Sequence, residues 1–210
     1  MTTPPQGLRE RKKQATREAL REAALRLAVE RGPDQVRVEE IAEAAGVSPR
    51  TYNNYFASRE QAIVAAVTAD RELRVAAAVA AEPTGTRLAD AVTKAVIEQY
   101  TSAGERERET LLLITTRDNL REAFLDATVG IEAPLTAVLA ERLGDTEPHT
   151  ARVLAASTAA AVRIALQVWL RPAGTAGTGL VVPTGSLPEL LRSALAPLAP
   201  AYDAAEERAR

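Results

Sequence analysis

The chain has 210 residues, enough for one domain or two small ones with a sizeable core, and its net charge is −2. It has no cysteine and one histidine, which excludes disulfides and thiolate metal sites and argues against zinc clusters and histidine-dependent catalysis. Abundant alanine and only 3% aromatic residues favour helices over strands. We therefore expect an all-α protein with no catalytic residue, no metal and no cofactor.

The charge is unevenly distributed along the chain. Residues 1–60 carry 11 Lys and Arg against 9 Asp and Glu, whereas residues 61–210 carry 15 against 19. A basic amino end on an acidic body indicates a polyanionic partner, although a solvated terminus explains it equally well. The amino end lacks the apolar segment of a signal peptide, and no run approaches 18 apolar residues. We expect a cytoplasmic protein without a membrane partner.

Apolar periodicity and helix-breaking residues divide the chain into about nine helical segments. The first is expected from about residue 9 to residue 30, ending before Gly32 and Pro33. Its apolar stripe consists of Leu20, Ala24, Leu27 and Ala28. The other helices are expected near 38–45, 49–55, 58–81, 86–102, 105–118, 120–143 (with a kink or break at Pro134), 149–170 and 186–200, and the one long loop at 172–185.

The most informative segment is 36–56, VRVEEIAEAAGVSPRTYNNYF. Two short helices separated by Gly46-Val47-Ser48 have the proportions of a helix-turn-helix, and Gly46 suits a left-handed turn. The side chains expected to face inward are Ile41, Val47, Tyr52 and Phe56. The second helix then exposes Arg50, Asn53 and Asn54, with Thr51 and Tyr55 at its edges. This mixture suits base edges and phosphates in a major groove, although it also fits an ordinary polar helix face.

These residues resemble the helix-turn-helix of the TetR (tetracycline-repressor) family of bacterial transcription regulators. The resemblance covers about residues 10–66 and follows the family pattern I-A-x-x-A-G-V-S-x-x-T-x-Y-x-Y/H-F-x-x-K/R-E. The matching residues are Ile41, Ala42, Ala45, Gly46, Val47, Ser48, Thr51, Tyr55, Phe56, Arg59 and Glu60. The resemblance implies a three-helix DNA-binding head with an amino-terminal arm, residues 1–57. A larger helical body, residues 58–210, would bind a small-molecule ligand and dimerise.

The resemblance also assigns roles to individual residues of the head. Those expected to contact DNA are Thr51, Tyr55 and Arg59 at phosphates, Arg50, Asn53 and Asn54 at base edges, and Lys12 and Lys13 on the arm. Two positions depart from the family pattern. Asn53 stands where the family usually has Tyr, which removes one phosphate contact. Arg37 stands where a Thr or Ser usually caps the helix expected near 38–45, so this cap is weak or supplied otherwise.

In the body, the helices near 149–170 and 186–200 resemble the pair that forms the dimer interface in the family. Their apolar side chains could equally complete the core of one chain. Ligand-site candidates are polar or aromatic residues among apolar helices: Tyr100, Thr116, Arg117, Phe124, Arg163, Gln167 and Trp169. For an arginine such as Arg163, pairing with a nearby carboxylate is the common alternative, and for Trp169 the alternative is packing.

Together these features favour a DNA-binding transcriptional regulator, a repressor released from a near-palindromic double-stranded operator by an unknown small molecule. The alternative is a helical protein-interaction or ligand-binding module with a degenerate head, supported by the missing cap at Arg37. An enzyme is less well supported, because the sequence has no nucleophile–base pair and no phosphate-binding glycine loop.

Overall fold

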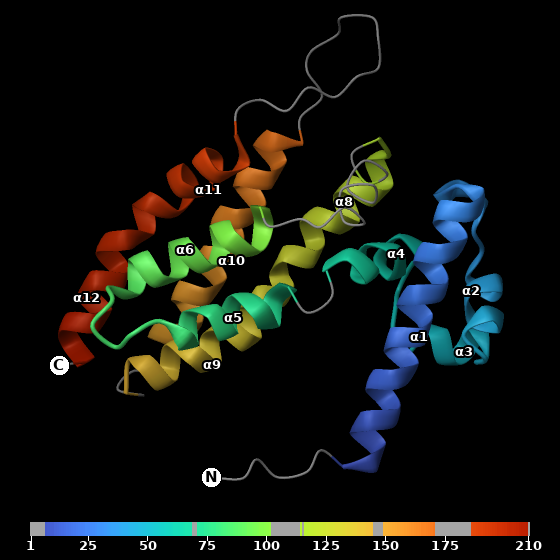
Figure 1. The fold of residues 1–210 in the computed structure, drawn as a ribbon, viewed down its shortest axis with the longest axis horizontal. Helices are drawn as coiled ribbons and strands as arrows, with labels where there is room; N and C mark the ends of the chain where they lie inside the picture. Colours follow the sequence, from blue (N-terminus) through green and yellow to red (C-terminus); the bar gives the residue numbers. More distant parts are fainter. Residues whose placement is uncertain are drawn as a thin grey trace, which may run out of the picture. The chain divides into compact units, whose positions relative to one another are not determined.

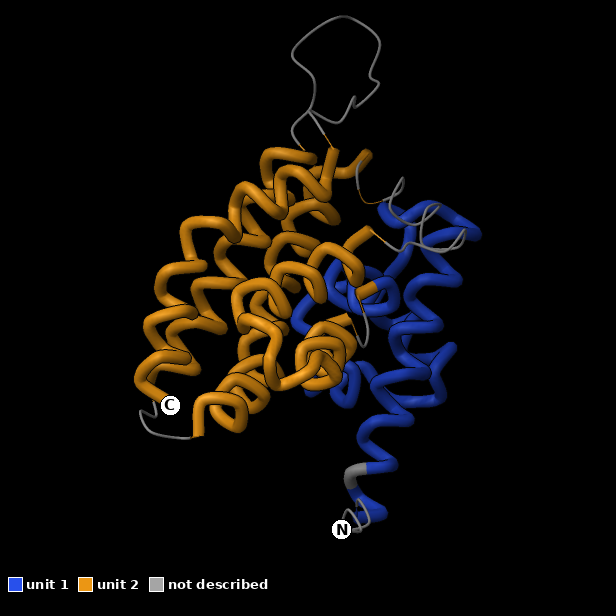
Figure 2. Tube along the Cα trace, turned by 60° about the vertical axis from the view of Figure 1, so that its left-hand side comes forward, with its two compact units in different colours: residues 1–67 blue, residues 68–210 orange. Residues whose placement is uncertain are grey.

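The computed structural model describes residues 7–68, 71–101, 114, 116–144, 149–170 and 186–209 (Figure 1). Every regular element among these residues is a helix, so the expected all-α fold is confirmed. The chain forms two compact units, Met1–Val67 and Thr68–Arg210 (Figure 2), called here the head and the body. The head extends beyond the expected boundary at residue 57, because it includes most of the helix that follows residues 48–56, which are called here the recognition segment.

Four α-helices and one short 3-10 helix build the head. They are α1 (Leu8–Arg31), η1 (Pro33–Gln35), α2 (Val38–Ala44), α3 (Pro49–Tyr52) and α4 (Arg59–Thr68). The predicted stripe of α1 is buried: Leu20, Ala24, Leu27 and Ala28. Gly32 and Gly46 have φ values of 84° and 69°, a region that side chains with a Cβ rarely enter. These two glycines therefore turn the chain after α1 and between α2 and α3.

The core of the head contains three of the four side chains expected to face inward. Ile41, Tyr52 and Phe56 are at most 2% exposed, whereas Val47 is only half-buried. α3 is shorter than the predicted helix at 49–55. It stops at Tyr52, whose carbonyl accepts both the Tyr55 N–H at 2.8 Å and the Phe56 N–H at 3.1 Å, so residues 53–55 form a turn.

The described helices of the body are α5 (Arg71–Ala81), α6 (Leu88–Thr101), α8 (Asp118–Asp126), η2 (Ala127–Ile131), α9 (Glu132–Arg142), α10 (Thr150–Trp169), α11 (Leu187–Leu195), η3 (Ala196–Leu198) and α12 (Ala199–Ala209). α10 packs between α9 and α11, and α6 packs against α5, α11 and α12 (Figure 1). The buried face of α10 is rich in alanine, which permits close approach of its neighbours. Side-chain packing around α10 therefore forms the centre of the body.

Two predicted helices differ from the structure at their boundaries. The segment expected at 120–143 is interrupted, as the predicted kink or break at Pro134 suggested, but the interruption lies earlier, at η2 (127–131), because the ring of Pro134 would clash with the carbonyl four residues before it in a continuous α-helix. The helix expected to end at residue 200 continues through η3 and α12 to Ala209. Pro197 and Pro200 stand in the first turns of these elements, where a missing N–H costs little.

Other expectations fall partly outside the described residues. The helix expected at 58–81 is present as α4 and α5, and residues 69 and 70 between them are not described. Most of the helix expected at 105–118 and the whole loop at 172–185 also lie outside the described residues.

Two stretches of the body, Asp118–Arg142 and Thr150–Trp169, are long and apolar enough to cross a membrane by length and composition. The first is broken by η2, and the second is α10, which packs between two other helices. Both therefore fit core helices of a helical body, which share these properties with membrane spans.

Arg142, at the end of α9, fixes the end of α5. Its guanidinium donates to three backbone carbonyls, from Nη1 to Val79 at 3.5 Å and Glu82 at 3.1 Å, and from Nη2 to Thr86 at 3.2 Å. Val79 lies in the last turn of α5, and Glu82 and Thr86 lie in the segment that follows, so this one side chain joins α9 to the end of α5.

Candidate functional site

The recognition segment begins at a well-formed helix cap. Ser48 Oγ accepts the Thr51 N–H at 3.2 Å and shares a hydrogen bond of 2.9 Å with Thr51 Oγ1, and Pro49 occupies the first helical position. Both features favour a helix start at this point, as predicted from the sequence. The orientation of α3 is therefore fixed at its first turn.

The outer face of the recognition segment is polar. Arg50, Asn53 and Asn54 are exposed, and Thr51 and Tyr55 are half-buried at the edges. Lys12 and Lys13 are exposed in the first half of α1. The structure thus leaves these seven side chains accessible on the head, and their contacts with DNA remain a prediction.

Tyr52 anchors the recognition segment from within. Its ring lies 5.9 Å from that of Phe56, and its hydroxyl donates to the Ser58 carbonyl at 2.8 Å. Burial, with a smaller contribution from the Glu60 charge, raises the pKa of Tyr52 above its usual value. The hydroxyl therefore remains a donor at neutral pH and links α3 to the residue before α4.

Arg59, expected to contact a phosphate, is largely engaged within the head. Its Nη1 donates to the carbonyls of Asp34 and Val36, both at 3.0 Å, and its Nε donates to Glu60 Oε1 at 2.8 Å. Burial raises the pKa of Glu60, but hydrogen bonds from Arg59, the Glu60 backbone and Ser58 outweigh it, so the pKa falls below its ordinary value. Arg59 thus braces the start of α4, and its Nη2 is the part left for a phosphate contact.

The cap that α2 lacks at Arg37 is supplied from another position. Glu40 Oε2 accepts the Arg37 N–H at 3.0 Å, while Glu40 Oε1 accepts from Arg31 Nη1 at 2.9 Å. This is the half of a capping box that needs no side-chain oxygen at the first position. One carboxylate therefore starts α2 and ties it to the end of α1.

Arg17 is a basic residue of the head to which the sequence assigned no role. Its guanidinium lies over the Phe56 ring, with Cζ 5.3 Å from the ring centroid. A cation held over an aromatic ring keeps its charge in one place on the surface. The spacing between Arg17 and Phe56 in sequence carries no signal of this contact, because α1 meets the recognition segment only in the folded head.

The ligand-site candidates of the body lie in different environments. Tyr100 and Phe124 are buried, Trp169 is half-buried, and Thr116, Arg117 and Gln167 are exposed. Arg163 donates from Nη1 to Asp126 at 2.5 Å, which is the carboxylate pairing weighed as its alternative. Among the contacts that the structure describes for these candidates, Tyr100 and Phe124 share one neighbour.

That neighbour is Arg71, which the sequence analysis missed. It is 4% exposed, and its Cζ lies 4.8 Å from the Tyr100 ring centroid and 5.8 Å from the Phe124 ring centroid. Burial raises the pKa of Tyr100 above its usual value, although the charge of Arg71 and its hydrogen bond act in the opposite direction. The sequence offered one indication that Arg71 is buried, namely its spacing. Arg71 lies four residues before Val75 and eight before Val79, on the buried stripe of α5.

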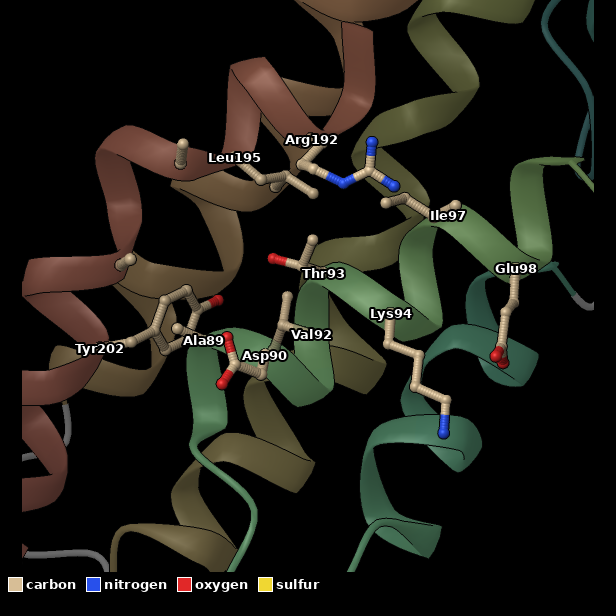
Figure 3. A pocket seen from close by; sticks show the side chains of 12 residues that line it. Ala89, Asp90, Val92, Thr93, Lys94, Ile97, Glu98, Arg192, Leu195 and Tyr202 are labelled. Carbon is tan, nitrogen blue, oxygen red and sulfur yellow. The ribbon is translucent and has the colours of Figure 1, made fainter. Parts of the chain in front are cut away.

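The body also has a groove of about 550 Å³ between α6 and the pair α11 and α12 (Figure 3). Val92, Ile97 and Leu195 contribute apolar surface, and Arg192 extends from α11 toward Ile97. None of the seven ligand-site candidates lines this groove. The body therefore offers two distinct places with an arginine beside apolar side chains.

Comparison with known proteins identifies the head. Residues 20–66 match the family model described as bacterial regulatory proteins, tetR family. The chain is 42% identical over 71 residues to the HTH-type transcriptional regulator TcmR of Streptomyces glaucescens, an alignment that covers 34% of this chain and 31% of TcmR. The chain thus spans about a third of the length of that relative.

The second relative covers more of the molecule. The chain is 30% identical over 146 residues to the HTH-type transcriptional regulator BetI of Rhizobium meliloti (strain 1021), covering 61% of this chain and 70% of BetI. Among solved structures, the TetR-family repressor FadR of Thermus thermophilus, in complex with lauroyl-CoA, aligns with a TM-score of 0.48 and 23% identity over 87% of this chain and 92% of FadR. The match to BetI covers more of the chain than the head alone contains, and with the family model it shows that the chain belongs to the TetR family of bacterial regulatory proteins.

Proposed function

We propose that the protein is a dimeric transcriptional repressor that binds a near-palindromic DNA operator through its head and releases it when a small molecule binds the body. Members of the family are transcriptional regulators, not enzymes. The observation that carries the DNA-binding proposal is the capped segment at Ser48, which presents Arg50, Asn53 and Asn54 on its exposed face. Amide and guanidinium groups on such a segment match the hydrogen-bonding edges of adenine and guanine.

A dimer is proposed through α10 and α11, with α12 extending the same chain end. Val153 and Ile164 of α10 are 61% and 56% exposed, and Ala160 between them is exposed as well. Spacings of seven and four residues place the three on one face of the helix. An apolar face of this kind suits a second copy, and a dimer would present two recognition segments about 34–36 Å apart, one turn of the duplex. A cytoplasmic location follows from the proposed role.

The alternative, an interaction module with a degenerate head, rested on the missing cap of α2. Glu40 now supplies that cap, so the head has no visible defect that would favour the alternative.

DNA titration tests the proposal. A duplex selected from a randomised pool by the full-length protein is compared with a scrambled duplex at several salt concentrations. We expect Asn53→Ala and Asn54→Ala each to reduce the preference for the selected duplex by about 1–3 kcal/mol. Lys13→Ala should weaken both duplexes alike and reduce the salt slope by about 0.9. Gln35→Ala, an exposed amide elsewhere in the head, is the matched control. Equal affinity for both duplexes, unchanged in the asparagine variants, would contradict the proposal.

A further inference from the structure

In the part of the body that the structure describes, one buried charge has no carboxylate partner. Among the residues that the structure describes, Arg71 is the only charged residue that is buried, and its Nε is the only buried side-chain N or O atom without a hydrogen-bond acceptor. Within the same residues, no carboxylate forms an ion pair with it. A buried cation is normally paired with an anion, so this position needs a specific explanation.

The surroundings of Arg71 compensate the charge only in part. The rings of Tyr100 and Phe124 lie within 5.8 Å of Cζ and attract the cation through their faces. An aromatic ring cannot replace a lone-pair acceptor for the N–H groups, which lie in the plane of the guanidinium. The Tyr100 hydroxyl forms a hydrogen bond with Arg71, but among the described residues nothing accepts from Nε, so this edge of the guanidinium is ready to donate to an oxygen of a ligand.

We infer that Arg71 is the anchor for the carboxylate of the regulatory ligand, a small organic anion with an apolar or aromatic body. This inference rests on the proposed function, in which the body holds the ligand. A carboxylate is the simplest acceptor for a guanidinium edge, and it neutralises the one buried charge. The rings of Tyr100 and Phe124 supply apolar surface for the remainder of the ligand. A cationic ligand is disfavoured because it would place a second positive charge beside Arg71.

The test uses pairs of probes that differ only in charge. Hexanoate, decanoate, benzoate and naphthoate are each compared with the corresponding primary amide, which has nearly the same shape and no charge. Binding to the full-length protein is measured by calorimetry and thermal shift, and the release of the selected duplex is measured in parallel. At least one carboxylate should bind about 10- to 100-fold more tightly than its amide, as expected for charge-assisted hydrogen bonds.

Variants then locate the binding site. Arg71→Met should abolish the preference for that carboxylate, and Arg71→Lys, which keeps the charge without the forked donor, should retain a weakened preference. Arg87→Met, in an exposed ion pair with Asp203, should bind the probe like the wild type. Arg192→Met tests the groove of Figure 3. Loss of binding in Arg192→Met but not in Arg71→Met would overturn the inference, as would a panel in which no carboxylate exceeds its amide.

A direct measurement keeps the test independent of variant folding. The Nε–H resonance of Arg71 in the ¹⁵N-labelled wild type should shift with the carboxylate probe and remain unchanged with its amide. An unchanged resonance at saturating carboxylate would contradict the inference. The DNA titration separates this result from the proposed function. A protein that binds the selected duplex but no anion refutes only the role of Arg71, whereas a protein without duplex preference refutes the proposed function.

Discussion

The head and the body use arginine in opposite ways. In the head, Arg59 donates to two backbone carbonyls and to Glu60, so its charge is matched within the chain. In the body, Arg71 is more deeply buried and lacks an acceptor at Nε. A unit that has to hold one rigid shape satisfies its own polar groups, whereas a unit that responds to a ligand benefits from an interaction completed only on binding. This difference predicts different responses to substitution.

The largest predicted effect is a loss of stability in the head that leaves the stability of the body unchanged. Phe56→Ala removes a nearly fully buried ring from the head and should lower the free energy of unfolding of the head by about 3–5 kcal/mol. The only tryptophan, Trp169, lies in the body, so its fluorescence reports the body alone, while circular dichroism reports both units. In urea, circular dichroism should show an earlier transition and the fluorescence midpoint should not move. Leu8→Ala, at an exposed position of α1, is the control. Equal shifts of both signals would show that the units unfold together.

The second prediction compares the two arginines directly. Arg59→Met leaves the carbonyls of Asp34 and Val36 without a charged donor and should destabilise the head by about 2 kcal/mol. Arg71→Met removes a buried charge that two aromatic rings and a hydrogen bond with Tyr100 compensate only in part, and should stabilise the ligand-free body by about 1–2 kcal/mol. Urea unfolding followed by circular dichroism and by Trp169 fluorescence measures the two effects. If both variants changed the free energy of unfolding in the same direction, the proposed difference between the two arginines would be wrong.

A smaller effect concerns a fully satisfied polar pair in the core of the body. The Tyr202 hydroxyl lies 2.7 Å from Thr158 Oγ1, and burial raises the pKa of Tyr202 to about 12, an effect that its hydrogen bond with Thr158 partly offsets. The folded state holds the Tyr202 proton more tightly than the unfolded state. The contribution of Tyr202 to the free energy of unfolding is therefore fully present below pH 10.0 and declines between pH 10.0 and about 12. Tyr202→Phe should cost about 1 kcal/mol near neutral pH and almost nothing at about pH 11. Urea unfolding followed by Trp169 fluorescence measures the free energy of unfolding of both proteins. A difference between wild type and Tyr202→Phe that stays constant with pH would contradict this prediction.

The smallest predicted effect refines the description of the head. Glu40→Ala removes both the cap of α2 and the contact with Arg31, and should cost about 1 kcal/mol. Glu40→Gln keeps an oxygen for the Arg37 N–H and should cost only about 0.5 kcal/mol, the contribution of an exposed ion pair. The circular dichroism transition of the head measures both. If the two variants were equally destabilised, the ion pair and not the cap would be the important contact.

The head could be predicted well because its signals are local. Ser48, Pro49 and Gly46 act on the backbone within a few residues, and the buried ring of Tyr52 follows from helical spacing. The sequence left the cap of α2 as weak or supplied otherwise, because Arg37 has no acceptor oxygen, and it did not point to Glu40. The cap from Glu40 was nevertheless readable, since a Glu three positions after a helix start commonly reaches back to the first N–H.

The body was harder to predict from the sequence, because its important contacts join segments that are distant along the chain. The helix positions near α10 were predicted from periodicity, but two proline residues at 197 and 200 suggested an ending where new helical turns begin. Arg71 fell on an apolar stripe, yet the sequence alone cannot tell whether such an arginine turns outward or lies between two rings of other helices. Only the packing of α5, α6 and α8 brings Arg71, Tyr100 and Phe124 together.

The hydrogen bond from Tyr52 to Ser58 has a mechanical consequence for a regulator. The buried ring of Tyr52 and this bond couple the recognition segment rigidly to the start of α4. A rotation of α4 would therefore turn Asn53 and Asn54 through the same angle instead of being absorbed in the loop at Ala57. In the proposed repressor, the direction of α4 would then set the fit to the operator, and a small tilt of this helix would suffice to break it.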